Sequence, residues 1–351
     1  MILALASGLA FYGFHSSLAQ TTNPAPAITK PTPVPTPVDD DEPLVIDTEL
    51  VNLSVKVVDR NNKFVGVLGQ GEFKVYEDNV LQPIEFFSKE EVPVNYVLLV
   101  DNSNSLRPQL EKVIEASKIL VNSNRAGDET CYIRFISSEK ITIERDFTAN
   151  RTELIEKLEE MYTEGGSTAV RDAVFLAAEK VDEYEKSKNP NDRKRRAVIL
   201  VTDGEDRDSF YQEQQLFEML READVQIYAI GFVGDLDKEG GFIRKSPQSK
   251  ATSLLKRMAE ETGGKAYFPD SVAMLPEIAR DIAAELRTQY SIGYAPTNDK
   301  RDGTFRAIRV AIADGPKKEK RIAITRTGRT AALDPKQAPA FQKPAASPQK
   351  P

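Results

Sequence analysis

Three short, almost uninterrupted apolar runs constrain the fold of this chain more than any other feature. They lie at residues 95–100 (NYVLLV), 197–201 (AVILV) and 225–232 (VQIYAIGF). Such runs are typical of strands in a parallel sheet, because helices cover both faces of that kind of sheet. Elsewhere in this region apolar residues recur with helical spacing, at 110–121, 153–161, 170–181, 216–223, 253–259 and 272–286. The alternation predicts an α/β fold over residues 93–287, a doubly wound and mostly parallel sheet with helices on both faces.

The segments on either side of this region, residues 43–92 and 288–328, have the alternating pattern of antiparallel strands. Val51, Leu53 and Val55, for example, are separated by polar residues. Each segment offers too few strands to bury its apolar face alone. Because the ends of a domain commonly lie close together, the simplest arrangement is one small β-sandwich built from both segments, with the α/β domain inserted. In the alternative, the first segment packs on the α/β domain and the second forms an independent hairpin.

Both ends of the chain have the composition of segments outside a folded core. Residues 1–19 begin with an apolar stretch and end on Ser17-Leu18-Ala19, which predicts a secretory signal peptide cleaved after Ala19; an uncleaved anchor is the alternative. Residues 20–42, rich in Pro and Thr, predict a disordered linker, and residues 329–351 a disordered tail. We therefore expect a secreted protein, or one of the periplasm or cell envelope, with no transmembrane span in the mature chain.

The rarest residues exclude whole classes of chemistry. Among 351 residues there is one histidine, His15, inside the predicted signal peptide, and one cysteine, Cys131. A mature chain without histidine cannot form a Ser-His-Asp triad or a His-ligated zinc site. The formal net charge of −7 disfavours nucleic acid as a partner. The remaining groups, chiefly carboxylates and hydroxyls, favour a hard metal ion bound through oxygen atoms.

Oxygen-bearing side chains follow two of the predicted buried strands. Asp101, Ser103 and Ser105 come directly after the first run, Asp203 follows the second, and Thr168 lies in a loop after a Gly-Gly pair. Parallel strands end at the same edge of a sheet, where ligands of doubly wound folds bind. These side chains therefore predict a site for Mg²⁺ or a similar cation. Alternatively, Asp101 or Ser105 simply caps a helix.

This arrangement resembles the von Willebrand factor type A (VWA) domain with its metal-ion-dependent adhesion site. The D-x-S-x-S pattern of that family is present at residues 101–105, followed by Thr168 and Asp203. Two flanking segments, residues 66–79 and 287–297, are similar to those of a VWA-related group of secreted bacterial proteins. The resemblance implies that Ser103, Ser105 and Thr168 bind the metal directly and that the two aspartates bind directly or through water. Ser167, beside Thr168, is the alternative hydroxyl.

The function that follows from this resemblance is binding, not catalysis. We expect a secreted module that uses Mg²⁺, or else Mn²⁺ or Ca²⁺, to capture an acidic group of a protein partner. A metal-dependent hydrolase is one alternative, but the predicted ligands include no obvious spare base. The other alternative is a structural envelope protein whose metal site is vestigial.

Overall fold

The computed structural model describes residues 50–61, 63–89, 91–186, 194–236, 246–316 and 319–333. All of them belong to one compact unit, Thr48–Pro351. The predicted signal peptide, the predicted linker and residues 334–351 of the predicted tail lie outside the described residues. None of the described helices is both long enough and apolar enough to cross a membrane.

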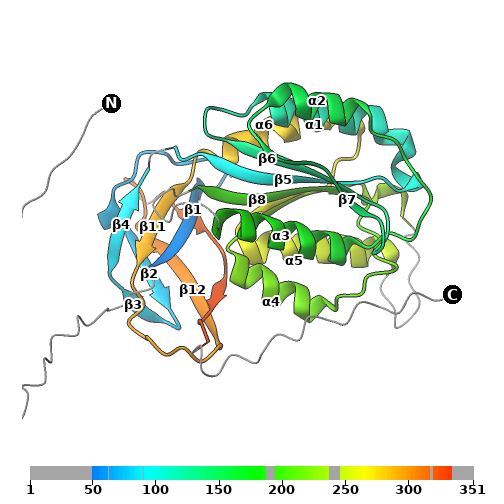
Figure 1. Cartoon of the computed structure of the whole chain (residues 1–351). Coiled ribbons are helices and arrows are strands. Elements are labelled where there is room, and N and C mark those ends of the chain that lie inside the picture. Colours follow the sequence, from blue (N-terminus) through cyan, green and yellow to red (C-terminus); the bar gives the residue numbers. More distant parts are fainter. Residues whose placement is uncertain are drawn as a thin grey trace, which may run out of the picture. The chain divides into compact units, whose positions relative to one another are not determined.

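A six-stranded sheet forms the centre of the α/β part, and β5 (Val94–Asp101) is one of its two central strands (Figure 1). The other strands are β6 (Glu129–Phe135), β7 (Ile141–Thr148), β8 (Arg195–Thr202), β9 (Gln226–Gly231) and β10 (Lys265–Tyr267). The strand order is β10-β9-β8-β5-β6-β7, and only β7 runs antiparallel to its neighbour. The predicted doubly wound, mostly parallel sheet is confirmed.

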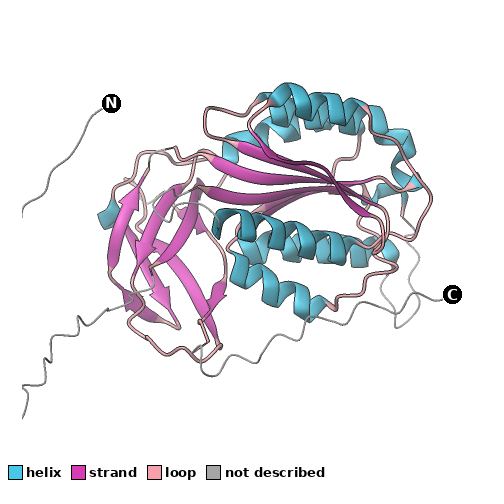
Figure 2. Ribbon diagram, viewed as in Figure 1, coloured by secondary structure: helices cyan, strands magenta, loops and turns pink. Residues whose placement is uncertain are grey.

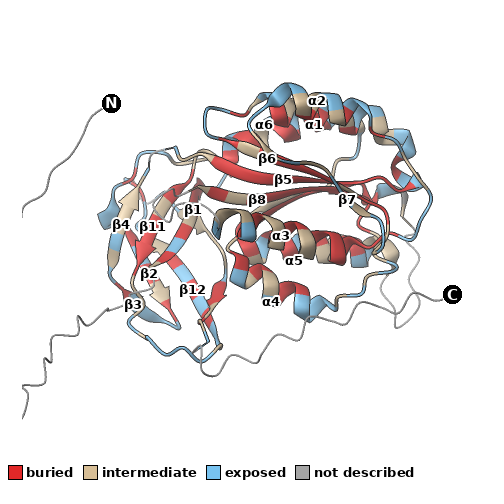
Figure 3. Ribbon diagram, viewed as in Figure 1, coloured by how far each residue is buried: buried red, intermediate tan, exposed pale blue. Residues whose placement is uncertain are grey.

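Helices cover both faces of this sheet (Figure 2). One face carries α1 (Leu110–Asn122), α2 (Arg151–Glu159) and α6 (Leu275–Glu285), and the other carries α3 (Val170–Lys186), α4 (Glu213–Ala223) and α5 (Pro247–Thr262). Side chains of β5 alternate between the two cores, with Leu98 and Val100 on the first and Val97 and Leu99 on the second. Every residue of β5 is buried, as its continuous apolar run predicts (Figure 3). Short 3-10 segments complete this part: η2 (Asn104–Gln109), η3 (Val233–Asp235) and η4 (Val272–Met274).

Two four-stranded antiparallel sheets form a β-sandwich, and each sheet combines strands from both predicted β segments. The first has the order β13-β1-β11-β4: β13 (Arg321–Ile324), β1 (Val51–Asp59), β11 (Tyr290–Tyr294) and β4 (Ile84–Ser88). The second has the order β14-β12-β2-β3: β14 (Gly328–Thr330), β12 (Phe305–Ile312), β2 (Phe73–Glu77), after the turn η1 (Gln70–Glu72), and β3 (Val80–Gln82). The second segment therefore does not form an independent hairpin.

The predicted tail starts too early in the chain, because residue 329 is part of β14. Arg329 Nε donates to Glu77 Oε2 over 2.9 Å, and Tyr294 Oη donates to the same oxygen over 2.6 Å. Glu77 and Tyr294 belong to different sheets, so the buried carboxylate joins the two halves of the sandwich. The buried charge of Glu77 is thus paired with Arg329, which belongs to β14.

Several contacts connect the sandwich to the α/β part. Arg195, buried at the start of β8, donates its backbone N–H to the carbonyl of Pro93 over 2.9 Å. Its Nη2 donates to the carbonyl of Gln289 over 2.7 Å. Lys56 of β1 forms a buried ion pair with Glu285 of α6. The two points where the chain leaves and re-enters the sandwich thus both contact Arg195, so they lie close together.

Gly264 allows β10 to pack directly against β9. A Cβ atom on this residue would lie 2.1 Å from the carbonyl oxygen of Ile227 and 2.7 Å from its carbon. Backbone atoms of an inner strand cannot move aside, so we expect Gly264→Ala to lower the free energy of unfolding by about 3 kcal/mol. Urea denaturation measures this change. Gly71→Ala is the control, because nothing lies within 4 Å of a Cβ atom there; equal effects of the two variants would contradict the prediction.

Candidate metal site

Three loops meet at the carboxyl edge of the central sheet: residues 101–105 after β5, residues 162–168 before α3, and residues 202–208 after β8. Backbone hydrogen bonds join the first two loops. Glu164 N–H donates to the carbonyl of Asn102 over 2.8 Å, and Ser103 forms a parallel bridge with Glu164. The carbonyl of Thr168 accepts from the backbone N–H groups that follow Asp203 in the third loop, at Arg207 and Asp208.

The loop after β5 turns its polar side chains inward. Ser103 N–H donates to Asp101 Oδ1 over 2.9 Å, and the Oγ atoms of Ser103 and Ser105 are 2.7 Å apart. Ser103 is the N-cap of η2, but its side chain makes no capping hydrogen bond. Ser105 lies inside η2, and Asp101 precedes the cap, so neither of these side chains caps a helix. The helix-cap alternative therefore does not account for them.

Asp101 and Asp203 bring two buried carboxylates to this edge. They are 1% and 5% exposed, and neither forms an ion pair within the described part of the chain. Burial, followed by the charge of Asp203, raises the pKa of Asp101 to about 7. Both causes penalise a charged carboxylate here, and a divalent cation between the two groups would remove that penalty. The site therefore fits a metal ion in its charge as well as in its donor atoms.

Thr168 lies at the same edge, as its place in the sequence predicts. Thr168 is only 5% exposed, whereas the adjacent Ser167 is exposed to solvent. This difference favours the Thr168 hydroxyl over that of Ser167 as the candidate ligand. The preceding glycine pair permits the loop to pack closely: a Cβ atom on Gly166 would lie 2.4 Å from Ile136 Cγ2. All of the predicted site residues thus come from the three loops that meet at this edge.

Thr202 was not identified from the sequence, but its hydroxyl orients one of the proposed ligands. Its Oγ1 donates to Asp101 Oδ2 over 2.7 Å and accepts from Gly204 N–H over 3.0 Å. The hydroxyl therefore fixes both the Asp101 carboxylate and the turn that carries Asp203. The available signal was its position, directly before Asp203 at the end of a buried strand.

Asp206 and Asp172 were also missed, and they hold the loops in place. Asp206 accepts from Val170 N–H over 3.0 Å and forms an ion pair with Arg171. Asp172 accepts from two consecutive N–H groups, those of Phe210 and Tyr211, each over 2.8 Å. Both carboxylates thus hold neighbouring loops in position.

The described residues contain no cluster of three or more His, Cys, Asp or Glu side chains suited to a metal, so a metal site at this edge depends on hydroxyl ligands as well.

Residues 95–281 match the family model of the von Willebrand factor type A domain, which is more than half of the chain. The chain belongs to the VWA family. This match confirms the family and fold class predicted from the sequence. VWA domains are typically metal-dependent adhesion or interaction modules that bind a divalent cation.

Several solved structures are similar to this VWA protein at low identity. An aerotolerance-related membrane protein from Bacteroides fragilis is 21% identical, with a TM-score of 0.41, over 55% of this chain and 98% of that one. A von Willebrand factor type A protein from Catenulispora acidiphila is 12% identical, with a TM-score of 0.45, over 82% and 75%. Mussel proximal thread matrix protein 1, with a zinc-occupied MIDAS motif, is 17% identical, with a TM-score of 0.44, over 56% and 48%. None of the curated proteins matches this chain.

Proposed function

We propose that this VWA protein is a secreted binding module that captures an acidic group of a protein partner through a bound Mg²⁺ ion. The five ligands are Asp101, Ser103, Ser105, Thr168 and Asp203. One observation carries the proposal. Two buried carboxylates, neither of which forms an ion pair within the described residues, lie at one sheet edge together with hydroxyl groups. Mn²⁺ and Ca²⁺ prefer similar oxygen ligands and are the alternative ions.

The composition of the ligand set explains why such a site binds an external acid. Two carboxylates balance the charge of a divalent cation, and hydroxyls add no further negative charge. The ion can therefore still coordinate a carboxylate oxygen from a partner protein. Within the chain, Thr202 and the Ser103 N–H hold the Asp101 carboxylate in one orientation, which lowers the cost of assembling the site.

The hydrolase alternative is less well supported. A hydrolytic reaction needs a group that accepts a proton from water, and the mature chain has no histidine after the predicted cleavage site. A screen of phosphatase and glycosidase substrates would detect a hydrolytic activity. The other alternative, a structural envelope protein with a vestigial metal site, predicts that titration with Mg²⁺ gives no binding heat.

Secretion is a separate part of the proposal and has its own test. If the signal peptide is cleaved after Ala19, mass spectrometry of the mature protein should give a chain that begins at Gln20. A full-length cytoplasmic species would contradict this and would return His15 to the functional chain.

The binding function can be tested with a short peptide that carries one glutamate between glycines. Fluorescence polarisation should show binding to the protein in Mg²⁺ and none in EDTA. The same peptide with glutamine is the control, because it keeps the shape and removes the charge. Equal binding of the two peptides, or binding that persists in EDTA, would contradict the proposed mode of capture.

Thr202 offers a test of how the site is held together. Thr202→Val removes the hydrogen bond to Asp101 and the acceptor for Gly204 N–H, but it leaves all proposed ligands in place. We expect Mg²⁺ affinity to fall about tenfold in calorimetric titration, the scale typical of residues that orient metal ligands. Thr202→Ser restores the hydroxyl and should recover affinity; a Ser variant as weak as the Val variant would count against this role.

A further inference from the structure

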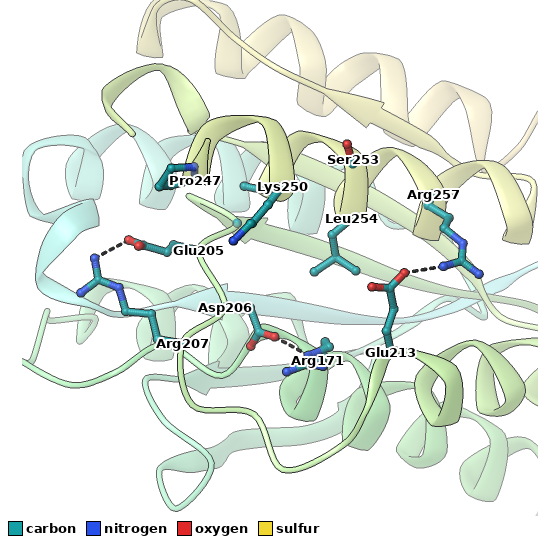
Figure 4. A pocket seen from close by; sticks show the side chains of 12 residues that line it. Arg171, Glu205, Asp206, Arg207, Glu213, Pro247, Lys250, Ser253, Leu254 and Arg257 are labelled. Atoms are coloured by element: carbon teal, nitrogen blue, oxygen red, sulfur yellow. Dashed lines mark hydrogen bonds and ion pairs between the residues drawn. The ribbon is translucent and has the colours of Figure 1, made fainter. Parts of the chain in front are cut away.

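A pocket lies directly beside the proposed metal site. It has a volume of about 660 Å³ and is lined by the loop after β8, from Gly204 to Arg207, and by the N-terminal half of α5 (Figure 4). Gly204 immediately follows Asp203, so the pocket begins one residue from a proposed ligand. Its volume is in the range of sites for small organic groups and is far larger than a single ion requires.

Among the described residues that line the pocket, one cation has no ion-pair partner in the described part of the chain. Three ion pairs line it: Arg207–Glu205, Arg257–Glu213 and Arg171–Asp206. Lys250, the fourth cation, forms no ion pair with any residue in the described ranges. Its side chain extends from α5 toward the loop that carries Glu205 and Asp206 (Figure 4). The described lining residues include four positive and three negative side chains. One carboxylate from a ligand would neutralise the remaining positive charge.

Apolar groups form the rest of the wall. Pro247, Ala251 and Leu254 line the pocket from α5. An aliphatic stem can therefore pack on the helix while its charged end lies near Lys250. Glutamate and aspartate side chains have this combination of a short apolar stem and a single carboxylate.

The pocket and the proposed metal site share the loop after β8, which packs against α5. Gly204 has a φ of +79°, and a Cβ atom on it would lie 2.9 Å from Leu255 Cδ1 and 3.0 Å from the Cβ of Ala251. The loop after β8 thus packs directly on α5. Asp206, which lines the pocket, also accepts from Val170 N–H, two residues after Thr168. The loop after β8 therefore belongs both to the wall of the pocket and to the proposed metal site.

We propose that this pocket binds a second acidic side chain of the same partner whose first acidic group binds the metal, with Lys250 as its cation. The ligand is thus a protein segment with two acidic residues, and the pocket selects for the second one. This inference rests on the proposed function. Two linked contacts of this kind raise affinity because the second one forms within the same complex.

The pocket can be tested without metal. In EDTA, N-acetylglutamate amide is titrated into the ¹⁵N-labelled protein, and amide shifts at residues 204–207 and 250–251 are followed by NMR. We expect saturable shifts at millimolar concentrations that N-acetylglutamine amide does not cause. Lys250→Gln should weaken the binding at least fivefold, whereas Lys256→Gln, an exposed lysine of α5 outside the pocket, should not. Equal shifts with both compounds, or no loss in Lys250→Gln, would overturn the proposal.

The joint use of both sites is tested in Mg²⁺ with glycine-serine peptides that carry two glutamates two to eight residues apart. At one or more spacings, such a peptide should bind about tenfold more tightly than the single-glutamate parent, and Lys250→Gln should remove only that gain. No gain at any spacing would overturn the two-acid proposal. Mg²⁺ titration of the wild-type protein reports separately on the proposed function, so failure of the metal site and failure of the pocket give different results.

Discussion

Replacing Asp101 by alanine is expected to reduce Mg²⁺ affinity by at least about 100-fold. Asp101 supplies one of two carboxylates to the proposed ion and accepts from both Ser103 N–H and Thr202 Oγ1, so its loss removes a charge and leaves two donors without their acceptor. Isothermal calorimetry measures the affinity. The melting temperature gives a second readout, because saturating Mg²⁺ should stabilise the wild-type protein, by about 2.7 kcal/mol at 100 times Kd, and should not stabilise the variant.

Asp208→Ala is the matched control for this experiment. Asp208 is the last residue of the loop after β8, and its replacement removes the same charge. Its side chain is exposed and forms no hydrogen bond or ion pair within the described residues, and the backbone N–H that donates to Thr168 is kept. We expect this variant to bind Mg²⁺ like the wild type. Circular dichroism in EDTA shows whether the Asp101 variant is folded. Wild-type affinity in a folded Asp101→Ala variant, or equal losses in both variants, would refute the ligand assignment.

Residues 43–92, expressed alone, should not form a stable fold. In the structure the strands that pair with β1 are β11 and β13, and β4 pairs with β11, so these partner strands come from the other end of the chain. Within residues 43–92, β1 has only a single bridge, between Val58 and Phe64, among the described residues. Without residues 288–333, the pairing of β2 with β3 is the one complete strand pair that remains. Two short strands cannot bury an apolar face, so limited proteolysis should degrade this fragment within the time that the full protein survives.

The complementary fragments test whether the VWA region is an inserted domain. Residues 93–287 alone should fold and bind Mg²⁺, because both cores of the central sheet lie within this range. Residues 43–92 joined by a short Gly-Ser linker to residues 288–333 should resist proteolysis. Pro93 and Gln289 both contact Arg195, so a few residues can span the gap. A protease-resistant 43–92 fragment, or an unfolded 93–287 fragment, would refute the insertion.

The central sheet, and the sheet edge at which the candidate ligands lie, were predictable because their signals are local. A strand covered on both faces must be apolar throughout, and the runs at residues 95–100 and 197–201 show this directly. Parallel strands end at one edge, so the residues that follow them meet there whatever the details of the helices. The motif at residues 101–105 needed only that rule to be placed beside Asp203.

The supporting contacts were not predictable, because they depend on packing between distant parts of the chain. The Thr202 hydroxyl could point to either face of its strand end, and only the fold directs it to Asp101. In the same way, only the fold brings Asp206 to Arg171 and to the Val170 N–H, contacts that make it a structural group. Such roles follow from distances across three loops, which spacing in the sequence does not encode.

The sequence by itself determined the VWA fold and the candidate ligands, because periodicity and short motifs are properties of neighbouring residues. The tertiary structure alone showed that Arg329, in a segment with the composition of a tail, donates to the buried carboxylate of Glu77. It also decided that Lys250 and the loop after Asp203 enclose a single pocket. These residues lie more than forty positions apart, and only the packing of α5 on the carboxyl edge of the sheet brings them together.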